Sequence, residues 1–90
     1  MTAFERNAMT DERVIAKAMV VAASVVDEDP PPASMLAGNK TALALYLALR
    51  HPDLLLADEA EAMRAMLAGQ FSHWCRKHPA SAAVLVSPCH

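Results

Sequence analysis

The chain has 90 residues, which is enough for one domain with a modest core. Hydrophobic residues make up 54% of it, but aromatic residues only 4%, so the core must be built mainly from aliphatic side chains. The presence of only two glycines argues against an all-β fold, and the formal net charge of −2 lacks the basic excess typical of nucleic-acid-binding proteins.

The sequence predicts a cytoplasmic protein with no membrane association. The first residues carry Glu5 and Arg6 instead of the apolar run of a signal peptide. No apolar stretch approaches the roughly 20 residues that a membrane-spanning helix requires. Cys75 and Cys89 are therefore expected to be reduced thiols, and a disulfide between them is not expected.

The first long helix is predicted over Asp11–Val26, with Thr10 or Asp11 as its N-cap. Apart from a narrow polar stripe, nearly all of its positions are apolar, which predicts a helix buried over most of its circumference. The sequence DEDPPP ends this helix because three prolines cannot continue it, and residues 27–33 are predicted to form a stiff connector. For residues 1–9 the sequence leaves two alternatives open: a short first turn, since Thr2 and Glu5 have the spacing of a capping box, or a frayed end.

A second helix is predicted over Lys40–Arg50, after a short turn within Ser34–Lys40 and with Asn39 or Thr41 as its cap. Its leucines alternate as they would in a strand. However, Ala and Leu favour a helix, and no β-branched residue lies within 42–49. In a helix these leucines fall on two opposite sides, so this element needs packing partners on both.

Pro52 is placed to open a turn, and a short apolar turn is predicted at Leu54–Ala57. The third helix is predicted over Asp58–His78, and Asp58 and Glu61 have capping-box spacing at its start. Gly69 lies in the middle of this range, where a kink or break is left open because glycine costs about 1 kcal/mol relative to alanine.

The third helix has the clearest amphipathic pattern in the chain. One face carries Met63, Met66, Leu67, Phe71 and Trp74. Residues 79–90 are predicted to form a tail, extended or pairing as an edge strand over Ala83–Val86. The sequence therefore predicts one all-α domain over residues 1–90: a small compact bundle of three main helices plus short helical turns, with an extended C-terminal tail.

A cluster of thiol and imidazole groups suggests a zinc-stabilised domain as one alternative function. The candidate ligands are Cys75, His78, Cys89 and His90. The paired spacings of zinc modules are absent, and adjacent residues such as Cys89 and His90 have little freedom to bind one ion together, so no metal or cofactor is predicted. A catalytic Cys75–His78 pair is disfavoured because the negative end of a helix dipole opposes a thiolate.

No phosphate-binding loop, nucleophile elbow or dinucleotide-binding motif occurs, so no enzymatic activity is predicted. The acidic groups around Asp27–Asp29 and Asp58–Glu61 lie at predicted helix ends, where capping and solvation explain them. Arg64 together with Arg76, Lys77 and Trp74 suggests a second alternative, a weak nucleic-acid-binding domain, although the balance of charge argues against it.

The three predicted helices carry more apolar surface than a 90-residue bundle readily buries. Either the first helix lies at the centre of the fold, or part of this surface contacts another chain. The leading hypothesis is a non-enzymatic protein–protein interaction module, such as a small regulator or phage-type inhibitor that occludes or mimics a partner, or a homodimer. The candidate partner-binding residues are Met63, Met66, Phe71, Trp74, Arg76, Lys77, Asp27, Glu28 and Asp29. For the methionines the sequence leaves a core role equally open.

Overall fold

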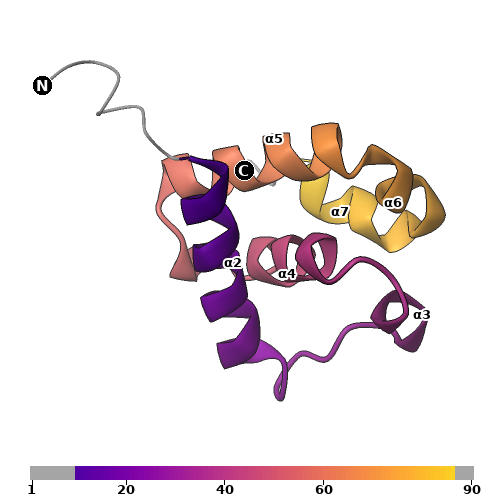
Figure 1. The fold of residues 1–90 in the computed structure, drawn as a ribbon. Helices are drawn as coiled ribbons and strands as arrows, with labels where there is room; N and C mark the ends of the chain where they lie inside the picture. The colour runs from indigo at the N-terminus through magenta and orange to yellow at the C-terminus, as the bar shows by residue number, and fades with distance from the viewer. Residues whose placement is uncertain (1–9, 87–90) are drawn as a thin grey trace, which may run out of the picture.

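The computed structural model describes residues 10–86, and these residues contain helices and turns but no strand. The α-helices are α2 (Asp11–Val25), α3 (Ala33–Leu36), α4 (Lys40–Leu49), α5 (Ala57–Gln70), α6 (Ser72–Lys77) and α7 (Ala82–Leu85) (Figure 1). Two 3-10 turns occur at Pro52–Leu54 and Pro79–Ser81. The all-α prediction is confirmed, while the expectations for residues 1–9 and 87–90 lie outside the described residues.

Helix α2 begins at its predicted position because Thr10 caps it. The Oγ1 atom of Thr10 accepts a hydrogen bond from the backbone N–H of Arg13 at 3.3 Å. The helix ends at Val25, one residue before the predicted boundary. The backbone N–H groups of Glu28 and Asp29 donate to the Val25 carbonyl at 3.0 and 2.8 Å, which closes the last turn before the prolines.

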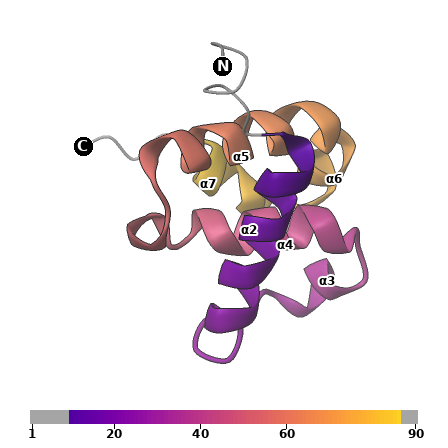
Figure 2. The same ribbon diagram turned by 60° about the vertical axis from the view of Figure 1, so that its left-hand side comes forward.

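The central helix of the bundle is α4. Asn39 caps it, since its Oδ1 atom accepts from the backbone N–H groups of Thr41 and Ala42 at 2.9 and 3.1 Å. Helix α2 packs on one side of α4 and α5 on another (Figures 1 and 2), which confirms the predicted need for partners on both sides. Its buried residues are Ala42, Ala44, Leu45, Tyr46, Leu47, Ala48 and Leu49.

The predicted burial of the first helix over most of its circumference is wrong. Helix α2 buries only one face, whose residues are Val14, Ala18, Val21, Ala22 and Val25. Arg13, Lys17 and Ser24 give α2 a polar stripe, whereas α4 carries no charged side chain between Thr41 and Arg50. The helix without charges therefore takes the centre, because burying an unpaired charge costs far more free energy than exposing alanine or valine.

The predicted third helix is divided in two at Phe71, whose backbone angles (φ −117°, ψ 30°) separate α5 from α6. Gly69 lies inside α5, so the break comes two residues after it. The predicted capping box of Asp58 and Glu61 is wrong, because α5 begins at Ala57 and the Leu56 backbone N–H donates to Glu59 Oε1 at 2.8 Å. The predicted apolar face does turn toward the core: Phe71 is partly buried, and the buried members are Met63, Met66, Leu67 and Trp74.

Residues 79–85 do not form the extended segment or edge strand considered for them. Pro79 opens a 3-10 turn that leads into α7, which packs against α5 (Figure 1). The side chain of Ser81 is completely buried, and its Oγ atom donates to the His78 carbonyl at 2.7 Å. This bond supports the turn that directs the chain back over the bundle. No helix within residues 10–86 has the length and apolar character needed to cross a bilayer.

The turn between α3 and α4 lies against the side chain of Trp74. A Cβ atom built on Gly38 would lie 2.6 Å from the indole Nε1 atom and 3.1 Å from Cδ1. Gly38 is therefore required by close packing, since any side chain there collides with the indole. A Cβ atom built on Gly69 would meet nothing within 4 Å.

We expect Gly38→Ala and Gly69→Ala to change stability in opposite directions. Gly38→Ala should destabilise the protein by about 1–3 kcal/mol, because the indole or the turn must move to admit the methyl group. Gly69→Ala should stabilise it by up to about 1 kcal/mol, because alanine favours a helix and no contact opposes the methyl group. Urea denaturation followed by circular dichroism measures both free energies of unfolding. Equal effects of the two substitutions would contradict the close contact between Gly38 and Trp74.

Candidate interaction surface

The apolar residues of the third predicted helix that were proposed to bind a partner lie mostly inside the protein. Met63 is completely buried, Met66 and Trp74 are buried, and Phe71 is partly buried. These side chains therefore fill the core, which is the alternative that the sequence left open for the methionines. A surface for a partner must be sought elsewhere among the described residues.

The outward face of α2 carries the most extended set of exposed apolar side chains on one helix. Met19 is 46% exposed and Val20 67% exposed, and Ala16 and Ala23 are exposed on either side of them. The four residues have the spacing i, i+3, i+4 and i+7, so they form one stripe, opposite the face that packs on α4. Figure 2 shows α2 crossing α4 with no other described element over its outward side. We call these four residues the outer stripe of α2.

An apolar groove lies beside the outer stripe, between α2 and α4. It holds about 200 Å³ and shares Ala23 with the stripe. Its other lining residues are Ala22, Val26, Lys40, Leu43, Ala44 and Leu47. Lys40 is the one charged residue in this lining. The stripe and the groove together offer the kind of surface on which a helix of another protein packs.

Carboxylates flank the outer stripe at both ends of α2. Glu12 is exposed near the start of the helix, and Asp27 and Glu28 are exposed just beyond its end. Asp11 lies near the same end as Glu12, where its Oδ2 atom accepts from Gln70 Nε2 at 2.9 Å. The surface therefore combines an apolar centre with acidic groups at both ends, and the exposed Arg13 accompanies Glu12 at the first of them.

Asp29, the third predicted acidic residue, differs from its neighbours because it is bound within the protein. Its two carboxylate oxygens accept from Arg50 Nε at 2.7 Å and from Arg50 Nη2 at 2.9 Å, a bidentate ion pair. The same carboxylate contacts His51 Nε2 at 3.0 Å, and Arg50 Nη1 donates to the Tyr46 hydroxyl at 2.9 Å. This network attaches the connector to the C-terminal end of α4.

The network shifts the ionisation of both members of the ion pair. The hydrogen bonds from Arg50 lower the pKa of the Asp29 carboxyl, and His51 lowers it further against a partial desolvation. The bond to Asp29, followed by that to Tyr46, raises the pKa of Arg50. Sequence reasoning did not distinguish Asp29 from Asp27 and Glu28, because its partners lie 21 and 22 residues away and no local pattern marks them.

Of the four candidate zinc ligands, Cys75 and His78 lie within the described residues, and Cys89 and His90 lie outside them. The Cys75 thiol donates to the Leu67 carbonyl at 3.5 Å, and the His78 ring packs on Trp74 with its centroid 4.6 Å away. Within residues 10–86 no three metal-binding side chains come together. The described part of the chain therefore gives no support for the zinc alternative.

The basic residues considered for nucleic-acid binding do not form a base-stacking surface. Arg76 and Lys77 are exposed on α6 and Arg64 is partly exposed on α5, but Trp74 is 7% exposed and packs against Tyr46. A tryptophan that stacks on nucleic-acid bases must present its ring face to solvent. Trp74 is therefore not placed to stack on bases, as the nucleic-acid-binding alternative would require.

Comparison of this chain with protein-family models, curated proteins and solved structures yields no match.

We expect Asp29→Asn to destabilise the protein at neutral pH. A carboxyl whose pKa is lowered by folding contributes stability above its unfolded pKa, near 3.8 for Asp29, and loses that contribution as pH falls through the lowered folded value. The difference in unfolding free energy between wild type and Asp29→Asn should therefore be constant near neutral pH and shrink below about pH 4. Urea denaturation across this range measures it, with the exposed Asp27→Asn as the control. A pH-independent difference would contradict the ion pair.

Proposed function

We propose that this protein is a non-enzymatic protein-interaction module that binds a partner through the outer stripe of α2. The observation that supports this proposal is the exposure of Met19 and Val20, opposite the buried face of the same helix. Fully burying a valine or methionine side chain contributes roughly 1.5–3 kcal/mol, and these two half-exposed side chains would supply part of that, with contacts in the adjoining groove and at the charged ends supplying the rest. Ala16 and Ala23 beside them would let a partner's backbone approach closely.

The charges around the outer stripe favour a partner with basic residues over a second copy of this chain. Packing two α2 helices together, parallel or antiparallel, brings the carboxylates of Glu12, Asp27 and Glu28 into the same interface, where the exposed Arg13 of each copy offsets only part of the negative charge. Like charges at such an interface oppose association. A helix with an apolar face and Lys or Arg near its ends would complement both the stripe and its negative ends.

In this proposal the protein acts as a small cytoplasmic regulator or phage-type inhibitor. By covering an apolar, basic surface on its partner, it would exclude whatever else binds there. The exposed acids Asp27 and Glu28 would then imitate the negative charge of the partner's usual ligand, and Asp29 would hold the connector that carries them. No catalytic group is needed for this mechanism.

We expect Val20→Glu to abolish partner binding without unfolding the protein, because Val20 is 67% exposed. A glutamate at this position removes apolar contact area and places a charge in the centre of the interface. Leu36→Glu is the matched control, since Leu36 is 58% exposed on α3, away from the stripe. Affinity capture from native cells, followed by mass spectrometry, should recover a protein with wild type and Leu36→Glu but not with Val20→Glu.

The captured protein should also be released as salt concentration rises, because the proposed contacts include exposed charges. A protein captured equally by all three variants would contradict the role of the outer stripe. Light scattering after size exclusion provides the remaining test. A wild-type dimer that Val20→Glu converts to a monomer would assign the stripe to a second copy and contradict the basic partner.

A further inference from the structure

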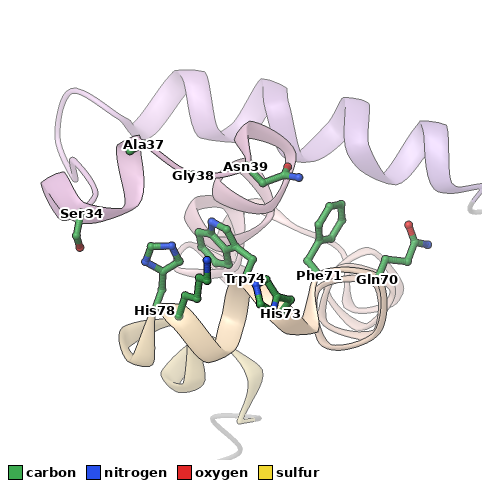
Figure 3. Close-up of a pocket in the computed structure, with 10 residues that line it drawn as sticks. Ser34, Ala37, Gly38, Asn39, Gln70, Phe71, His73, Trp74 and His78 are labelled. Atoms are coloured by element: carbon green, nitrogen blue, oxygen red, sulfur yellow. The ribbon is translucent and has the colours of Figure 1, made fainter.

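A second concave site lies between the α3–α4 turn and the stretch of chain from the end of α5 through α6. This cavity holds about 470 Å³, within the range of small-molecule binding pockets. Figure 3 shows side chains from both segments converging on it. The lining residues that matter for its chemistry are Gly38, Phe71, His73, Trp74, Lys77 and His78. The cavity is separate from the outer stripe of α2 and shares no residue with it.

One wall of the cavity is aromatic. Trp74 packs against Tyr46 of the core on one side, with ring centroids 6.3 Å apart, and against His78 on another, with centroids 4.6 Å apart. Phe71 contributes a second partly buried ring. Because Trp74 is only 7% exposed, the partly buried Phe71 supplies most of the accessible ring surface against which a flat ring of a ligand can lie.

The same wall contains a hydrogen-bond donor without an acceptor. Trp74 Nε1 is the one buried side-chain nitrogen or oxygen within residues 10–86 that has no hydrogen-bond partner. Leaving such a donor unpaired in the interior is costly, and a ligand that supplies an acceptor recovers that cost. The turn carrying Gly38, which also lines the cavity, lies against this N–H group, since a Cβ atom on Gly38 would lie 2.6 Å from Nε1 and 3.4 Å from His78 Nε2.

The charges of the residues that line the cavity favour a ligand of one sign of charge. Lys77 provides a cation, His73 and His78 provide imidazole groups, and none of the lining residues carries a carboxylate. Helix α4 begins next to the cavity at Asn39 and directs the positive end of its dipole there. An anionic group is therefore favoured in the cavity and a cationic group is opposed.

From these observations we propose that the cavity binds a small aromatic carboxylate. The ligand's ring lies against Phe71, beside the small part of Trp74 that reaches the cavity, and its carboxylate pairs with Lys77. One carboxylate oxygen accepts the Trp74 N–H as the turn carrying Gly38 moves away from the indole. This site does not depend on the proposed protein-interaction function.

Phenylacetate serves as the probe, and Trp74 reports its binding. Because Trp74 is the only tryptophan in the chain, its indole N–H gives one assignable peak in a ¹H–¹⁵N correlation spectrum. Titration with phenylacetate should shift this peak saturably, with a Kd on the order of 1 mM for so small and open a site. The neutral analogue phenylacetamide should bind at least about fivefold more weakly, because it lacks the charge that pairs with Lys77. Absence of a saturable shift, or equal binding of both probes, would overturn the proposal.

Lys77→Gln and Arg76→Gln form a matched pair that isolates the cavity charge. Each removes one positive charge from an exposed position on α6, but only Lys77 lines the cavity. Lys77→Gln should weaken phenylacetate binding about fivefold and leave phenylacetamide binding unchanged, while Arg76→Gln should leave both close to wild type. The same spectra report whether each variant is folded. Equal losses in the two variants would indicate a general charge effect and overturn the assignment of Lys77.

Discussion

The burial of α4 between α2 and α5 is the constraint on which the rest of the structure depends. Eight consecutive residues, 42–49, carry no charged side chain, and all of them except the partly buried Leu43 are buried. Once α4 occupies the centre, α2 can only pack on its outside, with one face inward. The apolar residues on the other face of α2 then remain exposed. The outer stripe is thus a direct consequence of which helix takes the middle of the bundle.

The ion pair between Asp29 and Arg50 determines how the chain returns to α4. Three prolines make the connector stiff, and the bidentate contact attaches its start to the far end of α4. The connector then leads to α3, where Met35 is buried, and to the turn at Gly38. That turn lies against the Trp74 indole, so a polar contact at one end of α4 contributes to the shape of the cavity near its other end.

The local parts of the fold could be predicted from the sequence. Periodicity and capping residues located α2 and α4 within one residue at each end, and the apolar face of the third predicted helix does face the core. The arrangement of the helices was not predictable in the same way, because α2 and α4 are both apolar on two sides. Whether α4 or α2 is buried depends on how many polar residues each helix carries, and the periodicity of apolar positions does not give that number.

For the candidate sites too, features set by neighbouring residues could be predicted from the sequence, and contacts between distant residues could not. The outer stripe was visible as an apolar pattern, but a pattern does not show which apolar face meets solvent. The Asp29 contacts and the approach of Gly38 to Trp74 join residues far apart in the chain, and no spacing rule connects them. Trp74 was proposed to bind a partner, whereas its importance comes from being buried with an unpaired N–H group.

The two apolar faces of α2 have a consequence for how the helix is oriented. Burial alone would permit α2 to rotate about its axis and present the opposite face to α4. Two contacts with α5 accompany the observed rotation: Lys17 lies 3.5 Å from Glu59, and Gln70 donates to Asp11 at 2.9 Å. The inner face of α2 begins and ends with a valine, whereas the outer face begins and ends with an alanine. The side chains of the two faces therefore differ in volume. A few polar contacts and a difference of methyl groups thus separate the native helix orientation from its inverted counterpart.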